Sequence, residues 1–434
     1  MNIANSSGYL DRLLQGPPPL PASPLAWFNT LRAEAVDRVG VLSVPTTRDE
    51  GWRFTDISPL TKLSLQSVRT ASSLRAADIE RFHLAEAATR LVFVDGVYAP
   101  QLSSPANDGG VLVTNLSTAV TAHPAAIKPH LGRHIEFRNN IFAALNTAFL
   151  HDGALVIVPR NAAVAAPVHL LFIATQKEAA SYPRCLVVAE SGSAVTVIED
   201  YVALQEEAYF TNAVTEIALA DNAHVNHVRV QRDGGQAFHI ANCAVSLAQA
   251  SRYHSVSVAL GARISRYDLN VLLAAEGAEC TIDGLALIAE RQLADSHTCI
   301  DHAKPHGVSR QLHKCIVGGA AHAVFNGKIM VRPGAQRTDS SQSSRNLLLT
   351  GKAQVDTTPQ LEIFADDVKC AHGATVGQLD REELFYLQSR GLSDATARNL
   401  LTYAFGAEII ARIPVASLRH RLEQTVLEQT TCQP

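Results

Sequence analysis

A seven-residue unit recurs near the middle of the chain, first as Leu219-Ala-Asp-Asn-Ala-His-Val225. It returns as Leu247-Ala-Gln-Ala-Ser-Arg-Tyr253 and Leu273-Ala-Ala-Glu-Gly-Ala-Glu279, and more loosely as Leu349-Thr-Gly-Lys-Ala-Gln-Val355. Each copy has the pattern of a strand end, a turn of small or polar residues, and a new strand. The starts at positions 219, 247 and 273 are 28 and 26 residues apart, a spacing typical of stacked supersecondary units.

The sequence around the repeat predicts a core built almost entirely of strands. From about residue 154 to residue 370, short β-type runs follow one another without an amphipathic pattern of helix length. All-β content without crossover helices fits a sandwich or a β-solenoid. The repeat favours the solenoid.

Helical patterns flank this core on both sides. The N-terminal candidates are Ser7–Gln15, Pro24–Val39, Ala76–Ala88 and Asn139–Leu150, with short strands at Leu91–Val94 and Val111–Thr114. The C-terminal candidates are a helix capped by Asp380 and stopped at Gly391, a second over Asp394–Ile413, and a third over Ser417–Gln429. We therefore expect a helix-rich part with a few strands over residues 1–150, a β core over 151–371, and a helical domain over 372–434.

The composition narrows the class of function. The chain has 434 residues, 47% apolar and 18% charged, with a net charge of −4, which indicates a globular protein with extensive burial. Neither a basic surface for nucleic acid nor an apolar run long enough for a bilayer is present. Seven cysteines, an odd number without a CxxC pair, predict free thiols in a reducing compartment. With no signal-peptide pattern at the start, we expect a cytoplasmic protein.

A thiol and an imidazole stand two residues apart at Cys370 and His372, where the strand-rich region meets the C-terminal helices. In an extended backbone, residues i and i+2 point to the same face, so both could address one ligand. Thiolate and imidazole suit iron, zinc or an iron–sulfur species. Two ligands do not complete a metal site. The alternative is a buried thiol and a hydrogen-bonded histidine without a ligand role.

A second group of histidines and cysteines precedes this pair. Its members are His297, Cys299, His302, His306, His313, Cys315 and His322. One interpretation is a second site for a metal or for sulfur. The other is a ladder of polar side chains at solenoid turns or at a subunit interface, and the spacing is not that of a zinc finger.

Three further motifs have structural interpretations. Asn326-Gly327 predicts a tight turn. Gly327-Lys328 is not a phosphate loop, because His322 and Ile329 occupy the places of the required glycine and hydroxyl residue. We therefore expect no ATP site in this chain. Trp52 and Phe54 predict an aromatic anchor for the core.

The chain resembles the SufB/SufD family of iron–sulfur cluster scaffold components, and most closely its SufD branch. The resemblance covers nearly the whole chain. Its longest motif is Cys370-Ala-His-Gly-Ala-Thr-Val-Gly-Gln-Leu-Asp-Arg-Glu-Glu-Leu-Phe-Tyr-Leu-Gln-Ser-Arg-Gly391. The others are Val324-Phe-Asn-Gly-Lys-Ile-Met-Val331, Asn346-Leu-Leu-Leu349 and Glu50-Gly-Trp-Arg-Phe-Thr-Asp56.

The resemblance implies a right-handed parallel β-helix flanked by helical domains. It implies a non-catalytic subunit that pairs edge to edge with a SufB-like subunit through the end of the β-helix and docks a SufC-like ATPase through the C-terminal helices. It also implies a transient iron–sulfur cluster, held between a cysteine of the SufB-like partner and the histidine at position 372, with Cys370 as a candidate further ligand. The exposed solenoid ends favour a homodimer of the isolated chain.

Two other functions remain open at this point. One is a purely structural partner without a ligand of its own. The other is a β-solenoid enzyme acting on polysaccharide, which needs clustered carboxylates and aromatic platforms for sugar rings. The two tryptophans and the lack of a tight carboxylate cluster in the strand-rich region disfavour the enzyme.

Overall fold

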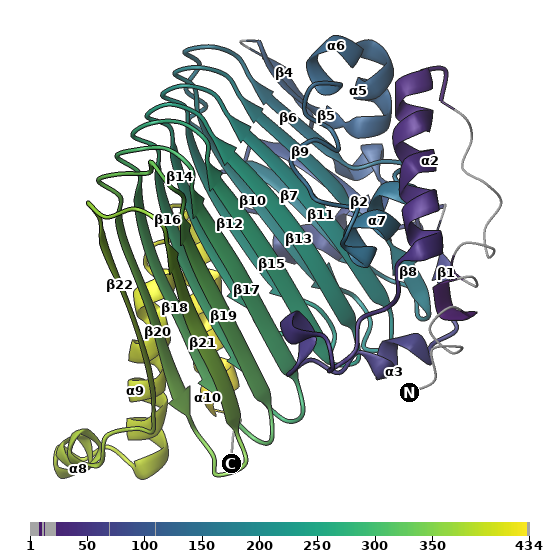
Figure 1. The fold of residues 1–434 in the computed structure, drawn as a ribbon. Helices are drawn as coiled ribbons and strands as arrows, with labels where there is room; N and C mark the ends of the chain where they lie inside the picture. The colour runs from purple at the N-terminus through teal and green to yellow at the C-terminus, as the bar shows by residue number, and fades with distance from the viewer. Residues whose placement is uncertain (1–7, 11–12, 14–22, 69, 109, 432–434) are drawn as a thin grey trace.

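Two parallel sheets form a flattened solenoid in the computed structural model, which describes residues 8–10, 13, 23–68, 70–108 and 110–431. From β9 (Arg184–Ala189) onward, successive strands alternate between the sheets, so that each coil gives one strand to each of them. The strands lie side by side along the molecule, with the N-terminal helices at one end and the C-terminal helices behind the other (Figure 1). The predicted solenoid core between helical flanks is confirmed.

The first sheet has twelve strands. They are β4 (Ala106–Asp108), β5 (Val111–Asn115), β6 (Ala154–Val158), β9 (Arg184–Ala189), β11 (Phe210–Leu219), β13 (Phe238–Leu247), β15 (Ile264–Leu273), β17 (Leu293–His302), β19 (His322–Val331) and β21 (Gln354–Ile363), with β1 (Gln66–Ser67) and β8 (Ala179–Ser181) off this path.

The second sheet has ten strands. They are β3 (Val97–Tyr98), β2 (Thr89–Val94), β7 (Val168–Ala174), β10 (Ala194–Ala203), β12 (His224–Arg232), β14 (Arg252–Ala259), β16 (Glu279–Ile288), β18 (Val308–Val317), β20 (Asp339–Leu348) and β22 (Lys369–Gly377).

The helices lie outside the two sheets. The described ones are α2 (Ala26–Val41), η1 (Glu50–Trp52), α3 (Ser58–Thr61), α4 (Ala76–Ile79), η2 (Glu80–Phe82), η3 (Pro100–Leu102), α5 (Leu116–Ala122), α6 (Pro124–Ile127), α7 (Ile141–Ala148), α8 (Arg381–Ser389), α9 (Asp394–Ile410) and α10 (Ala416–Thr431). None of these helices combines the length and apolarity needed to cross a membrane.

The sequence repeat is the coil of the solenoid. Leu219, Leu247 and Leu273 are register partners at the ends of β11, β13 and β15. The spacings of 28 and 26 residues are therefore the lengths of two successive coils. The looser copy at Leu349 follows β20 and belongs to the turns on the opposite side of the solenoid, which lead from the second sheet to the first.

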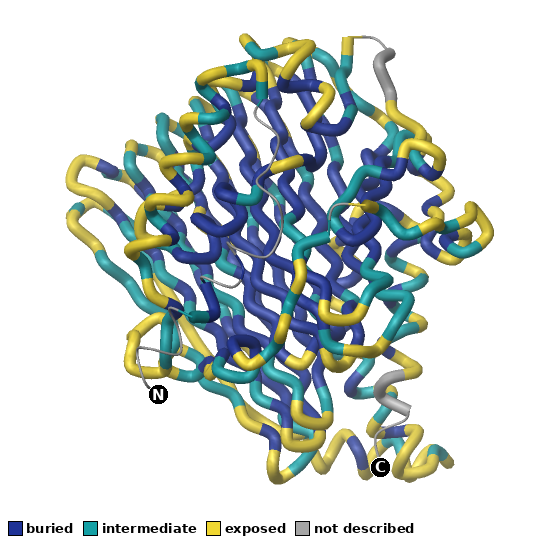
Figure 2. The backbone as a smooth tube through the Cα atoms, turned by 90° about the vertical axis from the view of Figure 1, so that its right-hand side faces the viewer, coloured by how far each residue is buried: buried dark blue, intermediate teal, exposed yellow. Residues whose placement is uncertain are grey.

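Apolar burial on both faces explains why strands such as β6, β7 and β9 read as nearly continuous apolar runs. All ten residues of β11 are buried, because Ile217 faces the solenoid core while Phe210 packs with Phe142 of α7 on the outer face. On the second sheet, Ile409 and Ile410 of α9 cover the outer face, and each contributes about 2 kcal/mol by burial. Figure 2 shows the buried residues concentrated along the strands and the exposed ones at the turns.

Most helix predictions are confirmed, with shifted ends. Asp380 and Ser393 cap α8 and α9 through their side chains. The element expected over Ala76–Ala88 is only one turn of α-helix followed by the 3-10 turn η2. Most of the helix expected over Ser7–Gln15 lies outside the described residues. Trp52 anchors the N-terminal segment as expected, with its ring 5.5 Å from that of Phe142.

The predicted turn at Asn326-Gly327 is wrong, because both residues lie in the middle of strand β19. Gly327 faces the solenoid interior, where a Cβ atom would stand 2.3 Å from the side-chain nitrogen of Gln342. The glycine therefore provides space for a side chain from the opposite sheet and does not reverse the chain.

Candidate functional site

Cys370 and His372 lie on β22, the last strand of the ten-stranded sheet. This strand pairs with β20 on one side, and no strand among the described residues pairs with its other side. The twelve-stranded sheet likewise ends at β21. The candidate ligands therefore stand at the open end of the solenoid, where the last coil has no covering coil.

The expected same-face arrangement of the pair is present. Cys370 is the register partner of Ser340, and His372 is the register partner of Gln342. Ser340 and Gln342 are buried inside the solenoid, so the pair continues an interior row of side chains. His372 is exposed and Cys370 is half-buried. Burial raises the pKa of the Cys370 thiol, and the nearby Asp339 carboxylate adds to the shift.

Polar side chains fill the solenoid interior beneath this pair. His302 and Ser340 both bond to the hydroxyl of Ser309, at 2.9 and 2.6 Å. Gln342 donates to Gln311 at 2.8 Å, and Gln311 in turn donates to a threonine of the opposite sheet. These hydrogen bonds fix the rotamers of the interior polar side chains as far as the coil that precedes β22. The polar residues at alternate, inward-facing positions of Asp339-Ser-Ser-Gln-Ser-Ser344 could have indicated this polar interior from the sequence, but the signal was not recognised.

The pair alone does not make a metal centre. Thiolate and imidazole can hold iron or zinc, but a closed site needs further ligands. Among residues 8–10, 13, 23–68, 70–108 and 110–431, no group of three or more His, Cys, Asp or Glu side chains is arranged to hold a metal ion. A metal or cluster at His372 would need ligands from outside the described residues.

The second histidine and cysteine group is dispersed over three strands and a turn. His297 pairs with Asp295 at 2.9 Å, and His322 pairs with Asp356 at 2.7 Å. His313 stacks on Phe325 inside the solenoid, with ring centroids 4.5 Å apart. The separate partners support the interpretation as polar side chains without a shared site, but the expected place at the solenoid turns is wrong, because all members except His306 lie on strands.

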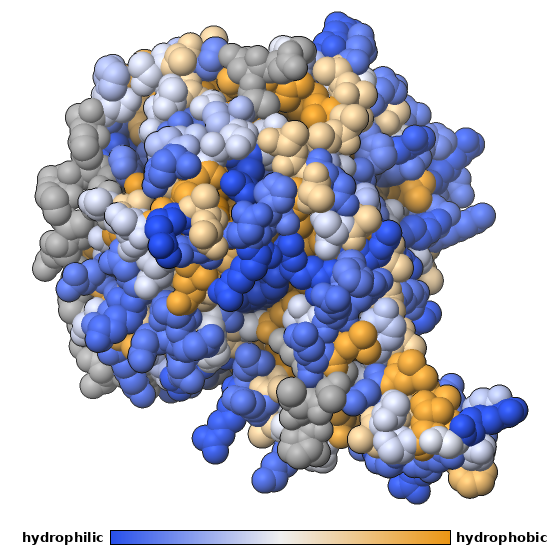
Figure 3. Space-filling view, turned by 180° about the vertical axis from the view of Figure 1, so that it is seen from behind, coloured by the Kyte–Doolittle hydropathy of each residue, from blue (hydrophilic) through white to orange (hydrophobic). Residues whose placement is uncertain are grey.

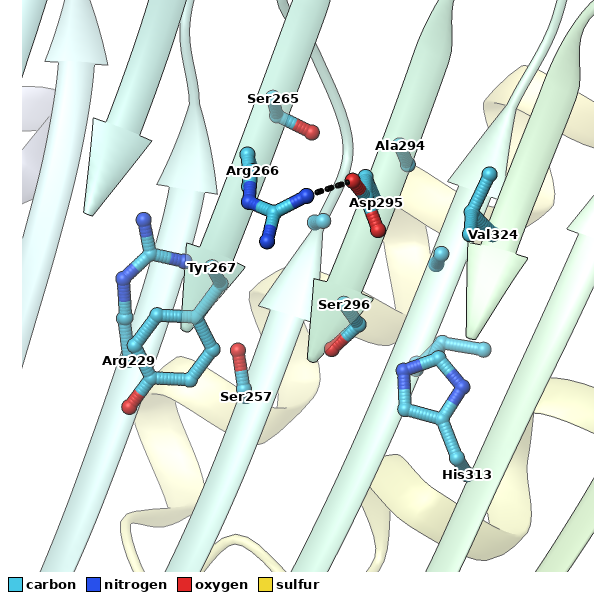
Figure 4. Close-up of a pocket in the computed structure, with 13 residues that line it drawn as sticks. Arg229, Ser257, Ser265, Arg266, Tyr267, Ala294, Asp295, Ser296, His313 and Val324 are labelled. Carbon is cyan, nitrogen blue, oxygen red and sulfur yellow. Dashed lines mark hydrogen bonds and ion pairs between the residues drawn. The ribbon is translucent and has the colours of Figure 1, made fainter. Parts of the chain in front are cut away.

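A buried cavity of about 20 Å³ lies near the middle of the solenoid. Figure 4 shows Arg229 and Tyr267 on one side of it and His313 on the other. Small side chains such as Ser257 and Ser296 line the space between them, which has room for about one water molecule. Burial lowers the pKa of His313 to about 4, so its imidazole is neutral at physiological pH.

Deeper in the solenoid lies a charged network that the sequence did not reveal. The Glu199 carboxylate is fully enclosed and accepts hydrogen bonds from Tyr201 at 2.7 Å and Thr215 at 2.8 Å, and His227 stands 3.0 Å from it. Burial by itself would raise the pKa of Glu199, but the contacts with His227, Tyr201 and Thr215 outweigh it and lower the pKa to about 2. The folded state therefore favours the ionised form of Glu199.

This network predicts a specific acid sensitivity. Because the folded-state pKa of Glu199 lies below its usual value of 4.5, its ionisation stabilises the fold above that pH, and the contribution disappears as the pH falls from 4.5 toward 2. Glu199→Gln should lower the free energy of unfolding at pH 7 by roughly 3 kcal/mol. The deficit relative to wild type should shrink toward zero near pH 2, as measured by urea unfolding across this pH range. Glu207→Gln changes an exposed carboxylate and is the control, so its free energy of unfolding should match that of the wild type at every pH. If the stability loss of Glu199→Gln did not change with pH, the lowered pKa of Glu199 would be contradicted.

Comparison with known proteins finds relatives over most of the chain. A family model described as SUF system FeS cluster assembly, SufBD core domain, matches residues 172–405, and one for the SufBD protein N-terminal region matches residues 8–170. The chain is 42% identical to an iron-sulfur cluster assembly SufBD family protein of Synechocystis sp., over 91% of this chain and 89% of that protein. It is 34% identical to the iron-sulfur cluster assembly protein SufD of Escherichia coli, over 87% and 88% of the two chains.

A more distant relative gives the same result. The chain is 28% identical to the iron-sulfur cluster assembly protein SufD of Bacillus subtilis, over 92% of this chain and 93% of that one. The two family models together span the N-terminal part and the solenoid with its first C-terminal helices. The chain therefore belongs to the SufBD family of iron–sulfur cluster assembly proteins, and within it is SufD-like.

Proposed function

We propose that this chain is a non-catalytic subunit of an iron–sulfur cluster assembly complex, and that it contributes His372 to a site shared with a SufB-like subunit. Cys370 is the second candidate ligand. The iron–sulfur cluster is the cargo of this site, held there transiently and passed on. Imidazole is a weaker ligand than thiolate for such clusters, which favours release.

The observation that carries this proposal is the position of His372 on β22, the edge strand at the end of the solenoid, whose outer side has no partner among the described residues. Its side chain is exposed, although its register partner Gln342 is buried one coil deeper. A second protein that continued the solenoid would cover His372 and bring its own ligands to the same row. The incompleteness of the pair is thereby explained, because the remaining ligands belong to another chain.

The free edges of β21 and β22 support pairing with such a subunit. Lys369 donates its N–H toward the chain just before β20, so the alternate residues Cys370, His372 and Ala374 direct theirs to the free edge. The free edge of β21 lacks one donor at Pro359, so β22 offers the more complete row of N–H groups to a partner. We infer that the partner adds its strands to these two edges. The same edges would serve a second copy of this chain when the partner is absent.

Edge pairing predicts that Ala374→Pro disrupts assembly. Proline removes the N–H that faces the partner while leaving the hydrogen bonds to β20, so binding of the SufB-like subunit should weaken about tenfold. The measurement is titration of the purified partner by calorimetry. Ala374→Ser is the matched control and should bind as the wild type does. Equal affinity of the proline and serine variants would exclude pairing through this edge.

The C-terminal helices support docking of a SufC-like ATPase. Phe385, Tyr386 and Leu400 are 72%, 57% and 44% exposed, which is unusual for large apolar side chains. Figure 3 shows apolar side chains on the lobe that projects at the lower right, where α8 lies. Lys314 of the second sheet pairs with Glu408 of α9, and Asp283 pairs with Arg412 just after α9, at 2.5 Å each. Motion of a docked ATPase would reach the sheet through these contacts.

A purely structural partner is the second candidate, because the same edges and helices would serve assembly without any ligand. The two functions are separated by reconstituting the complex anaerobically with SufB-like and SufC-like subunits and measuring bound iron and acid-labile sulfide. A ligand role for His372 predicts that its replacement removes the cluster from an intact complex. The purely structural role predicts unchanged cluster content.

A further inference from the structure

The turns that lead from the second sheet to the first enclose a broad groove of about 1070 Å³. Five successive turns contribute to it, namely those before β13, β15, β17, β19 and β21. Gly235 and Gly351 add no side chain to the groove, and Gly319, with a φ of +58°, lets its turn lie close to the backbone of Glu290. It is separate from β22 and from the exposed side chains of α8.

The groove carries an excess of positive charge. Arg263, Arg291 and Lys352 line it, and none of the three forms an ion pair with any of the described residues. The lining carboxylate is Glu290. At one end, Glu206 accepts a hydrogen bond from the backbone of Gly235. The remaining groove therefore has three cations for one carboxylate, at exposed positions where the desolvation cost of pairing is small.

The spacing of the cations selects the shape of the ligand. Arg263 precedes β15, Arg291 precedes β17 and Lys352 precedes β21, so the outer two are three coils apart. At about 4.8 Å per coil this is roughly 14 Å, too far for one small anion to reach all three. In an extended peptide, side chains at i, i+2 and i+4 share a face and span about 14 Å. Carboxylates at alternate positions of a peptide laid along the solenoid axis would match the outer two cations in spacing, and the long, flexible side chain of Arg291 could reach the middle carboxylate.

We propose that this groove binds an acidic, extended polypeptide segment of a partner protein. The binding is electrostatic, and the glycine turns allow the backbone of the segment to approach the solenoid closely. The site is independent of the ligand role of His372, because no residue of the groove belongs to β22.

The test uses the full chain and a fluorescein-labelled decapeptide of alternating glutamate and serine, followed by fluorescence polarisation. We expect saturable binding that weakens with added salt. The triple variant Arg263→Gln, Arg291→Gln, Lys352→Gln should raise the Kd at least about tenfold, since three exposed charge pairs each contribute modestly. The matched control is the triple variant Arg160→Gln, Lys128→Gln, Lys304→Gln, which removes three exposed cations outside the groove. Its Kd for the peptide should stay within about twofold of the wild-type value.

Three outcomes would overturn the proposal. One is the absence of saturable peptide binding by the wild-type chain. Another is an equal loss in the groove variant and the control variant, which would indicate a response to net charge alone. The third is tighter binding of a single-stranded oligonucleotide of the same charge, which would assign the groove to nucleic acid.

Discussion

Replacing His372 with alanine should leave the chain folded and assembled but remove the cluster from the complex. The side chain is exposed on an edge strand, so its loss leaves no cavity and no buried polar group. If the imidazole is a ligand at the shared site, bound iron and acid-labile sulfide should fall at least roughly tenfold after anaerobic purification with the partners. Complex formation, measured by size-exclusion chromatography, should be unchanged.

The strand itself offers a matched control for this result. Thr375 is also exposed on β22 but points to the opposite face, so Thr375→Ala should retain the full cluster content. Cys370→Ser tests the second candidate ligand separately, and a loss comparable to that of His372→Ala would give both residues the same role. Normal iron and sulfide in the His372→Ala complex would rule out the proposed ligand role and leave the purely structural partner.

The largest expected effect on stability comes from a buried ion pair far from this site. Arg184 of β9 and Glu216 of β11 are both fully buried, with 2.5 Å between their charged groups. Glu216 also accepts hydrogen bonds from four successive backbone N–H groups of residues 132–135. Arg184→Met should lower the free energy of unfolding by about 3–5 kcal/mol, because it leaves the Glu216 carboxylate buried without its counter-charge.

An exposed pair in the same protein provides the comparison. Arg138 and Glu34 are 3.4 Å apart and are 58% and 50% exposed, so Arg138→Met should cost less than about 1 kcal/mol. Both variants are compared by urea unfolding followed by circular dichroism. If Arg184→Met does not fold, Arg184→Lys keeps the charge and should be intermediate in stability, since lysine cannot reproduce the forked contacts to Asn146 and Thr147. A cost for Arg184→Met no larger than that of Arg138→Met would contradict the importance of the pair.

The solenoid could be predicted from the sequence because the repeat that corresponds to one coil is visible within a short stretch of chain. The repeating unit at Leu219, Leu247 and Leu273 has the length of one coil, and each coil repeats the same strand and turn chemistry. The caps at Asp380 and Ser393 were predictable for the same reason, since a cap bonds only to backbone groups within the next three residues.

Contacts between segments far apart in the chain could not be predicted from local sequence patterns. Asn326-Gly327 has the composition of a turn, but the need for space opposite Gln342 places it inside a strand. The Glu199–His227 network and the Arg184–Glu216 pair each join different strands. Charged residues inside apolar runs were visible in the sequence, but their partners were not, because the pairing depends on which strands become neighbours.

For the candidate site, the sequence by itself determined which residues could act as ligands and that Cys370 and His372 share one face. Both follow from side-chain chemistry and from the two-residue period of a strand. The tertiary structure decided that this face continues the solenoid interior and that none of the described strands lies beside the outer edge of β22. Strand order is set by the stacking of all coils, and in the described part of the chain the outer edge of β22 stays free because the chain leaves the solenoid after Gly377. The exposure of His372 is therefore a property of the whole fold.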